Sequence, residues 1–247
     1  REQYGDFPLV YGQVYTASPK EWKQGGNIYA RGPKKYEISG KKMEPVYDPS
    51  DMMLFPRVWD ASNDQGHAEF YRTWLGLQQG EKPNFVDNIK FFVSYQINFM
   101  YFRYFLWNFA GKQNDTQGYG NVRDGNWISG IPFIDNFFYG DQGMMPDSLK
   151  DNKAHNTLFF LPLILGLMGF FFQYNKHRKD TLIVALLFFF TGLAIVVYLN
   201  QARNQPRERD YAYVGSFYAF AIWIGLGVLS VYNFLQKKMK GSLTPVL

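Results

Sequence analysis

A short polar stretch between two long apolar runs could carry chemistry. Its sequence is NQPRERDYAY, residues 204–213, and it places two arginines and two carboxylates side by side. Guanidinium forks bind phosphate through paired hydrogen bonds, and neighbouring carboxylates can hold them in fixed positions. We therefore expect an anion-binding cluster, suited to a lipid phosphate, in which Arg207 and Arg209 bind the anion while Glu208 and Asp210 orient them.

Other residues are assigned to the same site, and simpler explanations stay open. Arg103 is the third candidate cation. Asn126, Trp127 and Tyr211 are expected to line a sugar or acceptor surface, because amides and aromatic faces suit polyols. Alternatively the stretch is a solvated turn whose arginines reach out to water, and Asp210 caps the following helix.

Familiar catalytic and metal-binding patterns are not found elsewhere in the sequence. The chain has no P-loop, no GxSxG, no HExxH and no dinucleotide glycine pattern. His67 with Asp60 and Asp64 could form the corner of a metal site, but a polar turn before a helix explains these residues better. The absence of cysteine excludes disulfides and thiolate metal sites. We predict no metal and no cofactor, and the catalytic residues stay unknown.

Three apolar runs dominate the second half of the chain. Residues 156–174, 181–199 and 214–235 each approach the roughly 20 apolar residues that cross a bilayer. Buried helices of a soluble core rarely stay apolar on every face for so long. The sequence therefore predicts a mainly α fold of polytopic membrane helices with three clear spans, and an irregular, aromatic-rich extramembrane region.

The charged links between the runs indicate an orientation. Basic residues follow the first run (175–180) and the third run (236–240), where there is almost no acid, whereas residues 201–210 are mixed. By the positive-inside tendency we expect a multi-pass protein of the bacterial inner membrane, with residues 111–155 and 201–213 on the periplasmic side. The net charge of +5 is spread along the chain and does not indicate nucleic-acid binding.

Residues 88–109 have helical spacing, with Asp87, Lys90, Ser94 and Asn98 on one face and phenylalanines around the rest. This helix is expected to be interfacial or re-entrant, and a fourth span is the close rival. Upstream, residues 7–17 and 45–55 are short extended candidates. The predicted organisation is an extramembrane region (1–87), the helix (88–110), a periplasmic loop region (111–155), a three-span region (156–240) and the start of a further segment (241–247). The chain reads as an interior piece of a longer protein.

Several runs resemble a known family. They are YFRYFLWNFAGKQND (101–115), GNWISGIPFID (125–135), FFLPLILGLMG (159–169), FFFTGLAIVVYLN (188–200) and QPRERDYAYVGSFYAFAIWIGLGV (205–228). They are similar to a multi-pass membrane family of Bacteroidota, a domain of unknown function related to protein O-mannosyltransferases of the GT-C type. The likeness spans most of residues 1–240. The resemblance implies a periplasmic active site and a polyprenyl-phosphate sugar donor. Its catalytic acid is expected in a first external loop near the N-terminus, and no residue here carries it over.

Two functions follow as expectations. The first is a membrane-embedded, GT-C-like glycosyltransferase that moves a mannose-like sugar from a polyprenyl-phosphate donor to a protein or envelope glycan acceptor. The second is a non-catalytic membrane scaffold or subunit of an envelope export or assembly complex. On either reading the chain contacts membrane lipid, and on the second it binds other envelope proteins.

Overall fold

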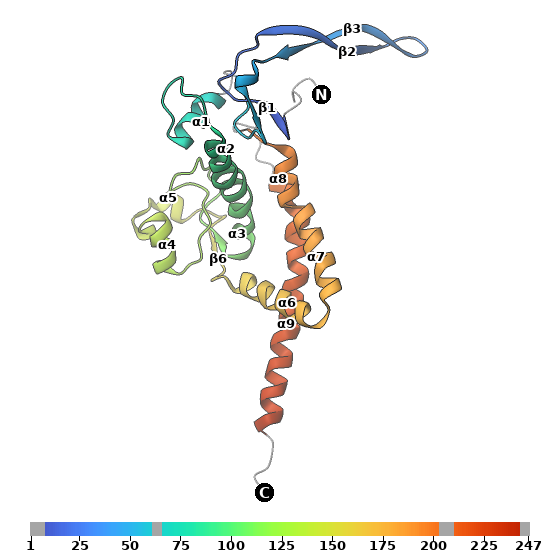
Figure 1. The fold of residues 1–247 in the computed structure, drawn as a ribbon. Helices are drawn as coiled ribbons and strands as arrows, with labels where there is room; N and C mark the ends of the chain where they lie inside the picture. Colours follow the sequence, from blue (N-terminus) through green and yellow to red (C-terminus); the bar gives the residue numbers. More distant parts are fainter. Residues whose placement is uncertain (1–7, 61–65, 203–209, 243–247) are drawn as a thin grey trace. The chain divides into compact units, whose positions relative to one another are not determined.

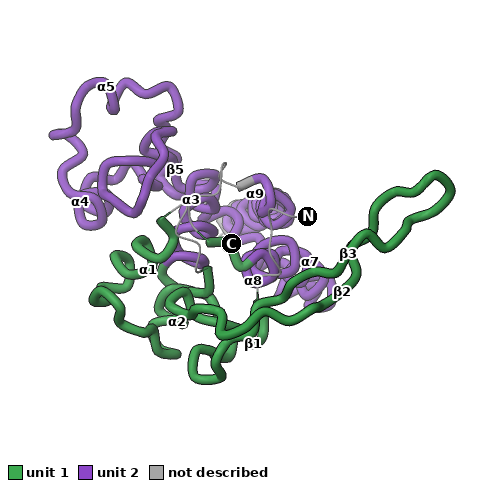
Figure 2. Tube along the Cα trace, turned by 90° about the horizontal axis from the view of Figure 1, so that it is seen from above, with its two compact units in different colours: residues 1–94, 200–207 green, residues 95–199, 208–247 purple. Residues whose placement is uncertain are grey.

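The computed structural model describes residues 8–60, 66–202 and 210–242. The chain divides into two compact units (Figure 2). Unit 1 comprises Arg1–Ser94 and Asn200–Arg207, and unit 2 comprises Tyr95–Leu199 and Glu208–Leu247. Each unit is therefore built from segments that are not continuous in the sequence.

Two short strands lie in unit 1 where extended structure was expected. β1 (Tyr11–Gln13) pairs antiparallel with β4 (Met52–Leu54), so that Tyr11 lies opposite Leu54. A single 3-10 turn (Pro49–Asp51) precedes β4, and the Asp48 side chain accepts a hydrogen bond from the Ser50 N–H at 2.9 Å. The predicted extended segments 7–17 and 45–55 are confirmed at these two strands.

A buried polar residue organises the centre of unit 1. α1 (His67–Leu75) and α2 (Phe85–Phe91) bring Tyr71 and Phe91 into edge-to-face contact, with ring centroids 4.9 Å apart. On α2, the Asn88 Oδ1 accepts hydrogen bonds from the backbone N–H groups of Arg57 (2.5 Å) and Val58 (3.2 Å). The Arg57 guanidinium is stacked 3.7 Å from the Phe55 ring, and burial lowers the pKa of Arg57 to about 10. Arg57 thus stays a cation at neutral pH although it is buried.

Asn200, from the second segment of unit 1, closes the same core. Asn200 is fully buried and donates from Nδ2 to the carbonyls of Pro8 and Pro56, both at 2.8 Å. Its own carbonyl accepts from the Trp59 Nε1–H at 3.2 Å. Asn200 also has a positive φ of 39°, a conformation that asparagine tolerates better than most residues. Its side chain therefore joins segments that are distant in sequence.

A long antiparallel ribbon forms the rest of unit 1 (Figure 1). It consists of β2 (Glu21–Arg31) and β3 (Tyr36–Val46), joined by the turn Gly32–Lys35. All of its residues are exposed or half-buried. The sequence analysis missed this ribbon, because its strands contain glycines, lysines and two irregular registers in place of an unbroken alternating pattern.

The stretch 88–109 is helical, as its spacing predicted. α2 continues into a π-helical segment, η2 (Phe92–Phe102), and then into α3 (Arg103–Phe109). Lys90 and Asn98 are exposed, as expected for the polar face, while Gln96 and Arg103 are buried. Whether the helix is interfacial, re-entrant or spanning stays a prediction.

Unit 2 contains the apolar helices. They are α6 (Leu161–Lys176), α7 (Arg178–Phe190), α8 (Leu193–Leu199) and α9 (Val214–Ser242). Their shared core comprises Phe105 and Phe109 of α3 with Phe220 and Trp223 of α9, and side chains of α6 and α7 pack against it. Helices α6, α7 and α9 thus form one packed cluster with α3.

The prediction of three membrane spans is wrong. Two helical segments of the described residues are long and apolar enough to cross a bilayer. They are Arg178–Leu199, which comprises α7 and α8, and Tyr211–Lys238, which includes most of α9. The first apolar run fails because residues 156–160 are not helical: Asn156–Thr157 form β6, and Phe159 and Phe160 have positive φ. The remaining 16 residues of α6 reach about 24 Å at 1.5 Å per residue, short of a hydrocarbon core of about 30 Å.

The predicted fold class therefore needs correction. The described residues combine helices with three two-stranded sheets, β1–β4, β2–β3 and β5 (Gly111–Lys112) with β6 (Asn156–Thr157). The expected irregular extramembrane region is largely ordered into these strands and short helices. Sequence patterns did not predict the pairing of β1 with β4 or of β5 with β6, because strands of two or three residues are too short to show a periodic pattern.

The two candidate spans are not buried core helices of this structure. Only 11% of the apolar window of Arg178–Leu199 and 28% of that of Tyr211–Lys238 is buried. Ile183 and Phe190 of α7 and Tyr218 and Phe234 of α9 are among their exposed apolar side chains. Exposed apolar surfaces of this kind are typical of contact sites for a membrane or for another protein.

Glycines allow α6 and α9 to approach closely. A Cβ built on Gly169 would lie 1.7 Å from the Trp223 carbonyl oxygen, and one on Gly227 would lie 2.1 Å from the Leu165 carbonyl oxygen. Both neighbours are backbone atoms, which cannot turn away. Small residues at a helix crossing are typical of membrane helices, whose association depends on close packing.

Candidate functional site

Most of the residues predicted to bind an anion lie outside the residues that the structure describes. Arg207, Glu208 and Arg209 lie outside the described residues. The Asp210 backbone begins a single 3-10 turn, η4 (Asp210–Tyr213), which leads into α9, and its side chain is also outside the described part. Tyr211 follows in this turn and is 59% exposed. Their predicted roles stay predictions.

The end of the charged stretch is nevertheless fixed. In the first turn of α9, Ser216 donates to the Tyr213 carbonyl at 2.7 Å and accepts from the Tyr101 hydroxyl at 3.1 Å. Tyr101 and Tyr213 are buried and their rings meet edge to face at 5.5 Å. The chain therefore enters α9 at a defined position beside the helix η2.

Arg103 lies in an aromatic cage under a loop. Its Nε donates to the Phe99 carbonyl at 3.0 Å and its Nη1 to the Gly125 carbonyl at 3.1 Å. Its guanidinium carbon is 4.0 Å from the ring centre of Phe99, 4.7 Å from that of Tyr104 and 5.0 Å from that of Trp107. Arg103 is 4% exposed, and its hydrogen bond to the Gly125 carbonyl connects the loop to α3.

The loop that covers Arg103 needs glycine at two positions. Gly118 and Gly125 both lie so that an added Cβ would be 3.3 Å from Arg103 Nη1, and it would also collide with loop backbone. Gly125 has a φ of +61°, which favours glycine. Backbone carbonyl groups can therefore approach the guanidinium directly.

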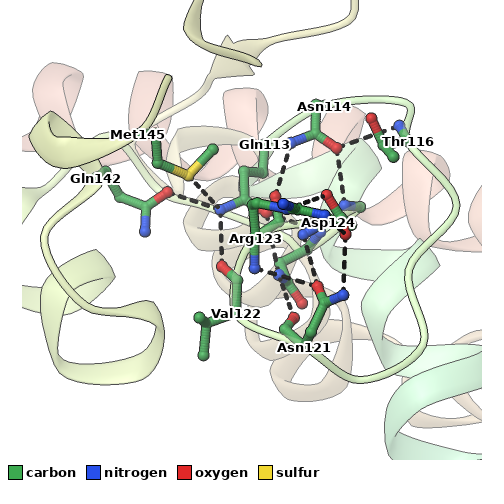
Figure 3. Close-up of polar contacts among 11 residues, drawn as sticks. Gln113, Asn114, Thr116, Asn121, Val122, Arg123, Asp124, Gln142 and Met145 are labelled. Carbon is green, nitrogen blue, oxygen red and sulfur yellow. Dashed lines mark hydrogen bonds and ion pairs between the residues drawn. The ribbon is translucent and has the colours of Figure 1, made fainter. Parts of the chain in front are cut away.

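Amide side chains hold this loop together (Figure 3). The Gln113 Oε1 accepts from the Asn126 Nδ2 at 3.0 Å, while its Nε2 donates to the carbonyl of Val122 and the Oε1 of Gln142. Asn114 accepts from the Gly125 N–H at 2.8 Å and donates to the Arg123 carbonyl at 2.9 Å. Asn126 thus belongs to a buried network, and its side-chain amide is hydrogen-bonded within the loop.

An ion pair closes the loop at its surface. Arg123 donates to both carboxylate oxygens of Asp124, at 3.0 and 3.1 Å, and the Asn121 amide donates to the same carboxylate at 2.9 Å. These bonds, those from Arg123 above all, hold the pKa of Asp124 below its ordinary value. The carboxylate is nearly buried while the Arg123 side chain is 62% exposed.

A second carboxylate positions the following helix. Asp135 accepts from the N–H and the hydroxyl of Ser129 and from the Gly130 N–H, each at 2.8 Å. It lies in α4 (Pro132–Tyr139), against which the predicted sugar-surface residue Trp127 packs through Phe138 and Tyr139. Trp127 also contacts Phe160 before α6. The ring is thus surrounded by aromatic neighbours on several sides.

Sequence reasoning missed the residues that build this loop, Gln113, Asn114, Asp124 and Asp135. Their signal was the density of Asn, Asp and Gly in residues 113–135, which favours turns closed by side chains. The sequence showed that turns occur there, but not which amide bonds which backbone group.

His67 pairs with Asp60, one of the two carboxylates considered with it for a metal site. Its Nδ1 lies 2.5 Å from the Asp60 Oδ2, at the start of α1. Asp64 lies outside the described residues. Within the described ranges, no group of three or more His, Cys, Asp or Glu side chains could hold a metal.

One family comparison bears on the chain. Residues 5–93 match a family of unknown function (DUF8416). The comparisons with curated proteins and with solved structures found no match. The matched residues include β1 to α2 and end in η2. This match shows no link to the O-mannosyltransferase-related family of Bacteroidota.

The loop chemistry leads to a test by pH. Because the pKa of Asp124 is lowered in the folded state, its stabilisation is present above the unfolded pKa of about 3.9 and is lost as pH falls through the folded pKa. We expect Asp124→Asn to lower amide-exchange protection of residues 113–126 near neutral pH, and this difference from wild type to shrink at acid pH as Asp124 becomes protonated. The exposed Asp147→Asn variant is the control, and a difference independent of pH would contradict the assignment.

Proposed function

We propose that the chain is the membrane-embedded part of a transferase that moves a mannose-like sugar from a polyprenyl-phosphate donor to a protein or glycan acceptor. The observation that carries the proposal is the place of the charged residues in the chain. Arg207 and Arg209 lie between two helices that are each long and apolar enough to cross a bilayer. An arginine pair at such a position is suited to a phosphate whose lipid tail stays in the hydrocarbon.

The chemistry follows from the leaving group. When the bond between the sugar and the phosphate oxygen breaks, negative charge grows on the phosphate, and fixed guanidinium groups stabilise that charge. Glu208 and Asp210 would hold the arginines in place. Arg103 is left out of this site, because its guanidinium donates to the carbonyls of Phe99 and Gly125 beneath the loop.

The resemblance of most of residues 1–240 to the O-mannosyltransferase-related family of Bacteroidota supports the same class of donor. It also supports a periplasmic site in the inner membrane. On this proposal the loop region, residues 111–155, supports the acceptor side through Trp127, whereas the Asn126 amide is bonded within the loop.

The test is donor binding by the full-length protein. Arg207→Ala should weaken binding of a polyprenyl phosphate or lower turnover at least roughly tenfold, because a lost charge-assisted contact costs about 1.5–3 kcal/mol. Arg207→Lys should restore part of the loss, since a point charge cannot form the paired bonds of a guanidinium.

Controls separate a lost contact from a lost fold. Lys179→Ala removes one positive charge from the first turn of α7, at the opposite end of the candidate span, and should leave donor binding unchanged. Protein amount and melting are compared for each variant. Normal donor binding by a stable Arg207→Ala/Arg209→Ala double variant would refute the proposal.

The second candidate function is a membrane scaffold or a subunit of an envelope assembly. One observation favours it: the amide and carboxylate groups of the loop form hydrogen bonds within the fold. These groups belong to Gln113, Asn114, Asp124 and Asp135. Such a loop is a rigid surface for a partner. The double arginine variant distinguishes the two functions, because a scaffold would keep its partners after the loss.

A further inference from the structure

The ribbon β2–β3 has two chemically different faces. Residues opposite each other in an antiparallel pair share a face. The pairs Trp22–Pro45, Gln24–Met43, Asn27–Lys41, Tyr29–Ile38 and Arg31–Tyr36 therefore form one face, which we call the aromatic face. The other face carries mainly charged residues, Glu21, Lys23, Glu37, Lys42 and Glu44.

The aromatic face is uncovered within unit 1. Its large apolar side chains are 53% to 72% exposed, and they are Trp22, Tyr29, Tyr36, Ile38 and Met43. On the opposite face Ile28 is the exposed large apolar residue. A two-stranded ribbon is marginally stable in water, and a contiguous apolar face on it marks a contact surface.

The turn at the end of the ribbon is basic. Arg31, Lys34 and Lys35 are exposed, and among the described residues no carboxylate lies within ion-pair distance of them. The Gly32 N–H bonds the Lys35 carbonyl at 2.9 Å, which closes the turn and gathers the three cations around it. This end of the ribbon would attract an anionic surface.

We propose that the aromatic face of the ribbon lies on the surface of an anionic phospholipid bilayer, with the basic turn among the headgroups. The proposal goes beyond the transferase function and rests on it only for the presence of a membrane at this protein. It adds a lipid contact made by strands, separate from the two candidate spans.

The composition of the face favours lipid over a protein partner. Tryptophan and tyrosine are enriched at the headgroup level of membranes, and lysine and arginine reach from there to lipid phosphates. The aromatic face combines three such rings with Lys41 and Arg31. The centre of a protein interface, by contrast, is depleted of lysine.

The natural absence of cysteine allows a direct test in the full chain. An environment-sensitive fluorophore is attached to Ile38→Cys on the aromatic face or to Ala30→Cys on the charged face. The protein is reconstituted in vesicles of phosphatidylcholine with or without phosphatidylglycerol, and in vesicles that contain spin-labelled lipid. We expect blue-shifted emission and quenching by the spin label at position 38 but not at position 30, and more of both with phosphatidylglycerol.

The basic turn has its own variant. Lys34→Glu with Lys35→Glu should lower the ratio of quenched to unquenched probe at position 38 by roughly fivefold or more for each charge removed. Lys23→Glu with Lys42→Glu makes the same change of charge on the other face and should have a smaller effect. Equal effects of the two pairs would overturn the assignment of the turn to headgroups.

A third probe keeps this result separate from the proposed function. Leu186→Cys lies on the exposed apolar surface of α7 and reports on membrane insertion by itself. Quenching at 186 without quenching at 38 would overturn the ribbon proposal and leave the membrane-embedded transferase standing. Protection of position 38 from aqueous quenchers without quenching by spin-labelled lipid would also overturn it, in favour of a protein partner.

Discussion

Gly169→Ala should separate α6 from α9 and destabilise unit 2 by more than about 3 kcal/mol. The added Cβ would lie 1.7 Å from the Trp223 carbonyl oxygen and 2.7 Å from the Gly227 nitrogen. Both atoms belong to the α9 backbone, so only a shift of the whole helix relieves the collision. The shift would also open the core in which Phe220 and Trp223 pack.

The matched control for this variant lies in α9, the helix against which Gly169 packs. A Cβ on Gly225 meets no atom within 4 Å, so Gly225→Ala should be neutral or slightly stabilising, because alanine favours helix over glycine by about 1 kcal/mol. Unfolding in detergent, followed by circular dichroism, compares the two variants. Similar stability of both would show that α6 and α9 do not cross at Gly169.

Arg103→Ala should release the loop formed by residues 113–126. The substitution leaves the carbonyls of Phe99 and Gly125 without these donors and opens a cavity among three aromatic rings. We expect a loss of about 2–4 kcal/mol, from unsatisfied buried carbonyls and the cavity together. Hydrogen exchange should show faster exchange at Gly125 and Asn126, whose N–H groups bond Asn114 and Gln113.

Two further variants give this prediction its specificity. Arg103→Lys should rescue little, because an ammonium group cannot stack on the rings and bond two carbonyls in the same way. Arg123→Ala removes an exposed arginine from the same loop and should have a smaller effect. Unchanged protection of the loop in Arg103→Ala would contradict the structural role of Arg103 and return it to the list of candidate anion ligands.

The sequence predicted what depends on local pattern. The apolar runs 181–199 and 214–235 correspond to the two helices that could span a membrane, and the spacing of residues 88–109 indicated a helix. The run 156–174 was wrongly predicted to span the membrane, because its apolar content says nothing about the backbone conformation of residues 156–160. Phe159 and Phe160 have positive φ angles just before α6 begins, and an apolar run does not indicate such a conformation.

The candidate site was less predictable, because its partners are far apart in the sequence. Arg103 was chosen for its charge, yet the carbonyl that it bonds belongs to Gly125, 22 residues later. Asn126 and Trp127 were expected to face a substrate, but their nearest neighbours are side chains of the same loop region. An isolated charge or ring in a sequence does not reveal whether the fold already uses it.

The contacts of Asn200 have a consequence for synthesis of the chain. This residue bonds the carbonyls of Pro8 and Pro56 and receives a bond from Trp59, across separations of 192, 144 and 141 residues. Domains usually fold as they emerge from the ribosome, N-terminal part first. Unit 1 instead waits for its last component until the whole segment Tyr95–Leu199 has been made. During that interval the first part of unit 1 lacks the amide that joins its segments, so α6, α7 and α8 are synthesised before the N-terminal unit can be complete.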